Sequence, residues 1–338
     1  MGVPMARPAP PDVGRVSPSA VRIHDDKMLK GVLSLKPRSS ASRVLARRET
    51  MTAYLFLLPS LVFFLGFVVF PMITCIGYSF TNATMNSKTA ATTFVGLRNF
   101  IDLWQDATFL QALKNTFVIV VVSVPTVCLF SLWVSSAVYK MNNKLLSAFR
   151  CIFYLPVVTG SVAVTVVWKW MFDYYNGIFN YILKDGLGVI EKNINWLGDS
   201  RYALWCIILI LFTTSVGQPI VLYISALGNV DNSLVEAAEV DGATQVQVFW
   251  RIKWPQMMPT TLYILVITTI NSFQCFALIQ LLTSGGSGTN TVMYYIYYTA
   301  FKLTEKAGHF GYANAMGVIL AIFIGILSAV QFKLGKEK

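Results

Sequence analysis

The segment from Asn232 to Thr244 (NSLVEAAEVDGAT) contains the densest pattern of residues that start and end a helix. Ser233, followed three residues later by Glu236, predicts a capping box, in which each side chain satisfies a free backbone N–H at a helix start. Gly242 is suited to the left-handed conformation that ends such a helix. The pattern therefore predicts a short helix that stops on a glycine.

One face of this helix is made of small or apolar residues. Leu234, Ala237 and Ala238 lie three and four positions apart, which places them side by side on a helix. Small side chains on that face let another protein surface approach the backbone closely. The chemistry expected here is docking, although Glu236 could equally do no more than cap its helix.

A second short helix is predicted directly after the glycine. Val248, Phe249 and Ile252 form an apolar stripe at helical spacing. Trp254-Pro255 is expected to end this helix, because the residue before a proline avoids the helical conformation. Two short amphipathic helices that turn on a glycine are thus expected between two apolar segments.

A second set of candidates consists of polar residues inside the apolar segments, where such groups are functional candidates by default. Gln218 precedes a proline that permits a kink, and Asn271 is expected at a comparable depth of the next segment. The candidates for a substrate path are Gln218, Asn271, Gln274, Asn314, Ser215 and Ser272.

These candidates are uncharged, which suits a carbohydrate, because sugars are held by neutral hydrogen-bonding groups and aromatic faces. Tyr294, Tyr295, Tyr297 and Tyr298 could supply such faces. The structural alternatives are interhelical hydrogen bonds, worth about 1 kcal/mol each in membranes, and a belt of tyrosines at the membrane interface.

The chain lacks the sequence signatures of several kinds of chemistry. The chain contains no Gly-x-x-x-x-Gly-Lys-Ser/Thr phosphate loop, the five cysteines have no metal-like or redox spacing, and neither His24 nor His309 has a partner pattern. We expect no catalytic or metal-ligating residues and no cofactor bound by this chain.

The elements that position these residues are apolar helices. The composition, 55% apolar and 13% charged, is too apolar for a soluble surface. A membrane-spanning helix needs about 20 apolar residues, and six stretches meet this test, with Lys169 as their sole ionisable side chain. The expected spans are 54–80, 117–138, 152–172, 202–227, 261–282 and 312–332. The predicted fold class is an all-α polytopic membrane protein.

The distribution of Lys and Arg predicts the orientation of these spans. Of the 27 such residues, 18 fall before the first span, in the second-to-third and fourth-to-fifth loops and at the C-terminus. Since basic loops stay inside, both termini are expected in the cytoplasm. The charge of +11 then reflects topology and contact with the lipid bilayer, with no nucleic acid as a partner. Residues 1–50 are predicted to be a disordered basic tail, and residues 51–338 the membrane domain.

The loop predicted between the fourth and fifth spans, residues 230–258, resembles the Glu-Ala-Ala loop of binding-protein-dependent ABC importer permeases. The matching positions are Glu236, Ala237, Ala238, Asp241, Gly242, Ile252 and Pro255. Trp254 stands where the family pattern has leucine. Leu57-Leu58-Pro59, Gly96-Leu97-x-Asn99-Phe100, Leu282-Thr283-x-Gly285-Gly286 and Gly311-Tyr312-Ala313-x-Ala315 extend the resemblance to the sugar and glycerol-phosphate branch.

The resemblance implies that the loop seats in a cleft of an ATPase subunit, where Glu236 meets the nucleotide-binding partner. It also implies a second homologous permease, an ATPase dimer that uses ATP and Mg²⁺, an extracellular solute-binding protein and a bacterial inner membrane. The alternatives are an ion-coupled secondary transporter or channel, in which ionisable groups often lie inside the spans, and a membrane enzyme, which needs converging reactive groups.

Overall fold

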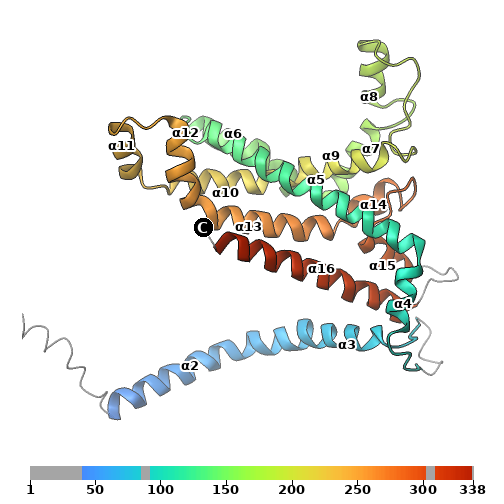
Figure 1. Cartoon of the computed structure of the whole chain (residues 1–338), viewed down its shortest axis with the longest axis horizontal. Helices are drawn as coiled ribbons and strands as arrows, with labels where there is room; N and C mark the ends of the chain where they lie inside the picture. Colours follow the sequence, from blue (N-terminus) through green and yellow to red (C-terminus); the bar gives the residue numbers. More distant parts are fainter. Residues whose placement is uncertain (1–39, 85–91, 302–308, 337–338) are drawn as a thin grey trace, which may run out of the picture. The chain divides into compact units, whose positions relative to one another are not determined.

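The computed structural model describes residues 40–84, 92–301 and 309–336, and every named element in this part of the chain is a helix (Figure 1). The predicted all-helical class is confirmed. The chain divides into two units, Met1–Pro71 and Met72–Lys338.

The first unit is dominated by one long apolar helix. α2 (Ser40–Phe64) continues through a π-helical turn, η1 (Leu65–Val69), into α3 (Phe70–Ser79), of which the part from Met72 onward belongs to the second unit. The stretch Thr50–Ser79 is long and apolar enough to cross a membrane. Of the tail predicted at 1–50, residues 1–39 lie outside the described residues, and α2 begins at Ser40, within that segment.

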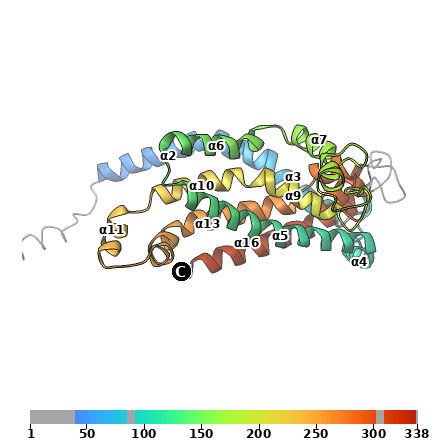
Figure 2. The same cartoon turned by 90° about the horizontal axis from the view of Figure 1, so that it is seen from above.

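The second unit is a bundle in which α5 is the central helix. α5 packs against α10 and α13, α13 also packs against α16, and α16 packs against α15. Both views show α5, α10, α13 and α16 running side by side (Figures 1 and 2). Its α-helices are α4 (Arg98–Gln105), α5 (Ala107–Val138), α6 (Asn143–Val158), α7 (Ser161–Met171), α8 (Ile178–Tyr181), α9 (Ala203–Ser215), α10 (Gly217–Gly228), α11 (Asn232–Val240), α12 (Gln245–Val248), α13 (Trp254–Phe273), α14 (Ala277–Leu282), α15 (Val292–Phe301) and α16 (Phe310–Lys336). Two π-helical turns, η2 (Ile182–Gly186) and η3 (Phe249–Lys253), complete it.

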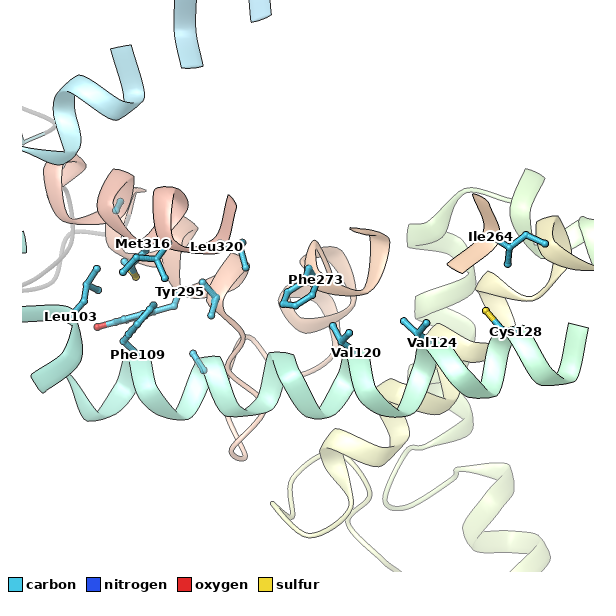
Figure 3. Packing of buried hydrophobic residues seen from close by; sticks show 14 of the residues in the cluster. Leu103, Phe109, Val120, Val124, Cys128, Ile264, Phe273, Tyr295, Met316 and Leu320 are labelled. Carbon is cyan, nitrogen blue, oxygen red and sulfur yellow. The ribbon is translucent and has the colours of Figure 1, made fainter. Parts of the chain in front are cut away.

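The main hydrophobic core lies along one face of α5. Val120, Val124 and Cys128 are four residues apart, so their side chains project from the same face. In the same cluster, Phe273 of α13 lies over Val120, whereas Tyr295 of α15 lies beside Phe109 near the start of α5, as Figure 3 shows. This core fixes α13, α15 and α16 against α5 along most of its length.

Two of the predicted spans are bent. α6 and α7 meet at 93°, and α9 and α10 meet at 41°. Within the described residues, four helices are long enough to cross a membrane, and the predicted six are reached when each bent pair counts as one span. The third predicted span, 152–172, is broken in the structure: Thr159 and Gly160 adopt extended backbone between α6 and α7, and Pro156 removes a donor from the last turn of α6.

Charged residues also enter these helices, because the helices extend beyond their apolar stretches. α5 begins ten residues before Phe117 and therefore contains Lys114, and α6 begins at Asn143 and contains Arg150. Both residues lie outside the predicted apolar spans, within which Lys169 is still the one charged side chain. Lys169 itself donates from Nζ to the Leu281 carbonyl oxygen at 3.2 Å, which ties α7 to the end of α14.

Candidate functional site

The loop that we call the coupling loop, residues 230–258, begins with α11 at one end of the bundle, opposite α4 and α8 (Figure 1). Asp231 caps this helix: its Oδ1 accepts the Ser233 N–H at 2.9 Å and the Ser233 hydroxyl at 2.7 Å. Two hydrogen bonds from Ser233 lower the pKa of the Asp231 carboxyl, and the bond from the hydroxyl has the larger effect. The predicted Ser233–Glu236 capping box was wrong, because the preceding aspartate is an equally good cap and adds charge that suits a helix start.

Gly242 ends α11 in the left-handed conformation, as predicted, with φ +80°. The Ala243 N–H donates to the Ala238 carbonyl at 2.9 Å and the Gly242 N–H to the Glu239 carbonyl at 3.1 Å, so the turn satisfies carbonyls at the helix end. A Cβ at this glycine would meet no atom within 4 Å. The turn therefore depends on backbone conformation alone.

A complete capping box starts the second helix. The Thr244 Oγ1 accepts the Gln247 N–H at 3.4 Å, and the Gln247 Oε1 accepts the Thr244 N–H at 2.8 Å. The sequence signal for this box, Thr-x-x-Gln, was present and was missed.

The second helix does not end at Trp254-Pro255, so that prediction was wrong. α12 passes through the π turn η3, in which the Trp254 N–H bonds to the Phe249 carbonyl, and continues as α13. The proline lies in the first turn of α13, where its missing N–H is least costly.

The outer surface of the coupling loop is apolar and exposed. Val240 is 87% exposed, Val246 67% and Leu234 51%. Exposed apolar residues grouped on one protrusion are typical of a docking surface. Of the residues that match the family pattern, Glu236, Ala237, Asp241, Gly242 and Pro255 are exposed, whereas Ala238 and Ile252 are half-buried.

A second feature, a small polar cavity, lies where the fourth span bends. Ser215, Gln218 and Asn271 line a cavity of about 160 Å³. The bend follows from Pro219, whose missing N–H interrupts the hydrogen bonds between α9 and α10. The other lining residues are Val157, Thr214, Pro219, Ile267 and Thr268, so all eight are uncharged. The sequence prediction thus named three of the polar residues that meet here.

The remaining three candidates lie elsewhere. Gln274 follows the last residue of α13 and is exposed, and Ser272 is 2% exposed without lining the cavity. Asn314 donates from Nδ2 to the Phe310 carbonyl of its own helix at 2.8 Å. Since α13 ends at Phe273, helical spacing does not extend to Gln274.

The other end of α5 holds a buried carboxylate whose partners the sequence did not indicate. Asp106 is 7% exposed and caps α5, accepting the N–H groups of Thr108 and Phe109. Its Oδ2 also accepts the hydroxyls of Tyr295 at 2.7 Å and Tyr312 at 3.0 Å. Tyr295 therefore has a structural use, and the predicted run of tyrosines is not a uniform interfacial belt, since Tyr294 and Tyr295 are buried.

Comparisons with known proteins identify the family. Residues 107–336 match the family described as the binding-protein-dependent transport system inner membrane component. A probable ABC transporter permease protein of Bacillus subtilis is 32% identical over 85% of this chain and 91% of its own length. A multiple sugar-binding transport system permease protein of Streptococcus mutans is 31% identical (83% and 94%), and a lactose transport system permease protein of Rhizobium radiobacter is 29% identical (87% and 97%).

Two solved structures share the fold. A bacterial ABC transporter involved in the import of the acidic polysaccharide alginate has a chain that matches with a TM-score of 0.71, 24% identity and coverage of 87% of this chain and 99% of that chain. Its complex with an alginate pentasaccharide-bound periplasmic protein matches with a TM-score of 0.68, 23% identity and coverage of 84% and 93%.

The bent helical bundle is the fold of the matched ABC transporter chain. The chain belongs to the inner membrane components of binding-protein-dependent transport systems. It is a permease subunit of an ABC importer, which decides against the ion-coupled and enzymatic alternatives.

Proposed function

We propose that this permease carries a mono- or oligosaccharide and that Ser215, Gln218 and Asn271 line its path. The observation that carries the proposal is the cavity at the bend of the fourth span, whose eight lining residues are all uncharged. Hydroxyl and amide groups can exchange hydrogen bonds with sugar hydroxyls without desolvating an ion. The names of several relatives, among them lactose and multiple-sugar permeases, support the same substrate class.

The proposal includes the partners and the orientation that this path requires. The chain pairs with a second, similar permease, and the coupling loop faces the cytoplasm, where its exposed Leu234, Val240 and Val246 dock on an ATPase subunit. Both termini are then cytoplasmic, in agreement with the placement of Lys and Arg. An extracellular binding protein delivers the solute at the α4 end in this proposal; the complex of the alginate transporter with a periplasmic protein supports a partner of this kind.

Transport proceeds by alternating access in this proposal. The ATPase pair closes on ATP and Mg²⁺ and displaces the coupling loops of both permeases. The bent spans then change their packing, and the cavity opens to the opposite side of the membrane. This chain contributes docking and a path, and ATP hydrolysis takes place in the partner.

The test is reconstitution of the chain in vesicles with the products of its neighbouring genes. ATP-dependent uptake is measured for radiolabelled lactose, arabino-oligosaccharides, starch-derived oligosaccharides and, as a control, a mixture of amino acids. We expect uptake of at least one saccharide and none of the amino acids. Uptake of amino acids without any saccharide contradicts the substrate class, and absence of any ATPase among the copurifying proteins contradicts the partner assignment.

A further inference from the structure

Lys253 is a buried cation at the inner end of the coupling loop. It is 7% exposed and lies in η3, between the two coupling helices and α13. A buried ammonium is unfavourable unless it is held by a partner. Among the side chains that the structure describes, Lys253 and Asp106 are the two charged groups that are buried.

The partner that holds Lys253 is Tyr139, the residue that follows α5. The Lys253 Nζ donates to the Tyr139 hydroxyl, and it also lies 4.9 Å from the centroid of the same ring. A hydrogen bond and a cation–π contact thus join the same two side chains. They connect the coupling loop to the central helix of the bundle, across 114 positions of the sequence.

Tyr139 continues a line of polar contacts along α5. Ser131, Ser135 and Tyr139 are four residues apart and lie on one face of the chain. The Ser135 hydroxyl is shared between the Ser131 carbonyl of its own helix, at 2.6 Å, and the Ile220 carbonyl, at 3.0 Å, and the Ser131 Oγ lies 3.4 Å from the Val216 carbonyl. Both serines are fully buried.

These two carbonyls flank the bend of the fourth span. Val216 separates α9 from α10, and Gln218, two residues later, lines the polar cavity. The Val216 carbonyl still accepts the Ile220 N–H at 3.1 Å, so the Ser131 hydroxyl approaches the second lone pair of this oxygen. A continuous set of contacts therefore runs from the coupling loop to the cavity through one face of α5.

We propose that the Lys253–Tyr139 contact is the joint that passes movement of the coupling loop to α5 and, through Ser131 and Ser135, to the cavity at the bend. Lys253 is a positioning residue in this proposal. The inference rests on the proposed coupling of this loop to an ATPase, and it assigns the transfer of movement to a residue pair outside the positions that match the family pattern.

The experiment uses the reconstituted transporter with Lys253→Met or Tyr139→Phe. Methionine keeps the length of the lysine stem without the charge, and phenylalanine keeps the ring without the hydroxyl. Ser215→Cys, in a background free of the five native cysteines, reports the state of the cavity by its rate of maleimide labelling. Labelling is measured with and without ATP and vanadate, so that no transported solute is needed, and ATP hydrolysis and saccharide uptake are measured in parallel.

We expect Lys253→Met to retain ATP hydrolysis while the ATP-dependent change in labelling and the uptake per ATP fall about fivefold, within the usual range of coupling effects. Tyr139→Phe shows a smaller loss, and the double variant is no worse than Lys253→Met alone, because the two side chains act as one unit. Lys253→Arg restores most of the coupling, since it keeps the charge and the contact with the ring.

Two matched controls carry the same chemical changes at exposed positions. Lys144→Met removes a charge at the start of α6, and Tyr263→Phe removes a hydroxyl from α13; both are expected to behave as the unmodified chain. If Lys253→Met lowers hydrolysis, labelling change and uptake in equal proportion, or lowers none of them, the inference is wrong. If Lys253→Met does not assemble, Tyr139→Phe decides by the same criterion. If the unmodified transporter shows no ATP-dependent change in labelling, the proposed function itself is wrong.

Discussion

The two ends of α5 each hold a buried charge against tyrosine, but they hold it differently. At one end the Asp106 carboxylate accepts two backbone N–H groups and two tyrosine hydroxyls. At the other end Lys253 contacts one hydroxyl and one ring, both of Tyr139. The carboxylate joins three helices through four hydrogen bonds, whereas the ammonium joins two elements through its contacts with a single side chain. The comparison indicates one end that stays fixed and one end that can shift.

The largest expected effect is on stability at the fixed end. Asp106→Ala removes a helix cap and leaves the hydroxyls of Tyr295 and Tyr312 without this acceptor, which should cost about 3 kcal/mol in total. The midpoint of thermal unfolding of the purified protein measures the loss. Asp102→Ala is the control: its 3.8 Å ion pair with Arg98 is exposed and contributes little. Equal shifts of the unfolding midpoint in Asp106→Ala and Asp102→Ala would contradict the assignment of a fixed end.

Local features of this structure were predictable from the sequence, and contacts between distant residues were not. The turn at Gly242 and the apolar helices follow from neighbouring residues. The partners of Asp106 lie 189 and 206 positions away, and no short-range pattern links a cap to a distant tyrosine. The candidate cavity was predictable in part, since an amide beside a proline marks the bend at Gln218. The burial of Lys253 could not be predicted, because a lysine in a polar loop is normally exposed and only the packing of the folded chain covers this one.

Substitutions at two glycines test the same comparison with smaller expected losses of stability. Gly285, between α14 and α15, has φ +74°, and a Cβ there would lie 2.3 Å from the ring of the buried Tyr294. Gly285→Ala should cost about 2 kcal/mol, because overpacking adds to the backbone strain. Gly242→Ala should cost about 1 kcal/mol from backbone strain alone, since its surroundings are open. Thermal unfolding of both variants checks the order.

The functional effects of these glycines should run in the opposite order. Replacing Gly242 by the bulkier valine changes the coupling turn and lowers uptake per ATP, while Gly285→Ala leaves that ratio unchanged. Unchanged uptake and ATPase stimulation in Gly242→Val would show that the turn does not take part in coupling.

The smallest effect is expected between the two ends, at the cavity. Gln218→Leu removes one hydrogen-bonding group from the proposed path and should raise the KM for saccharide uptake about fivefold, the equivalent of one hydrogen bond. Stability should change little. Thr213→Val is the control, because this hydroxyl bonds to the Ile210 carbonyl of its own helix and does not line the cavity. A KM that is the same in both variants would remove Gln218 from the path.

The helical run from Gln245 to Phe273 changes direction at the π turn η3, so that α12 and α13 point different ways (Figure 1). α13 alone extends from η3 to the cavity, which Asn271 lines near its far end. At 1.5 Å per residue its 20 residues span about 30 Å, and a tilt of about 5° around its midpoint displaces each end by about 1 Å in opposite directions. A push on η3 then moves Asn271 without any residue of α13 having to unfold.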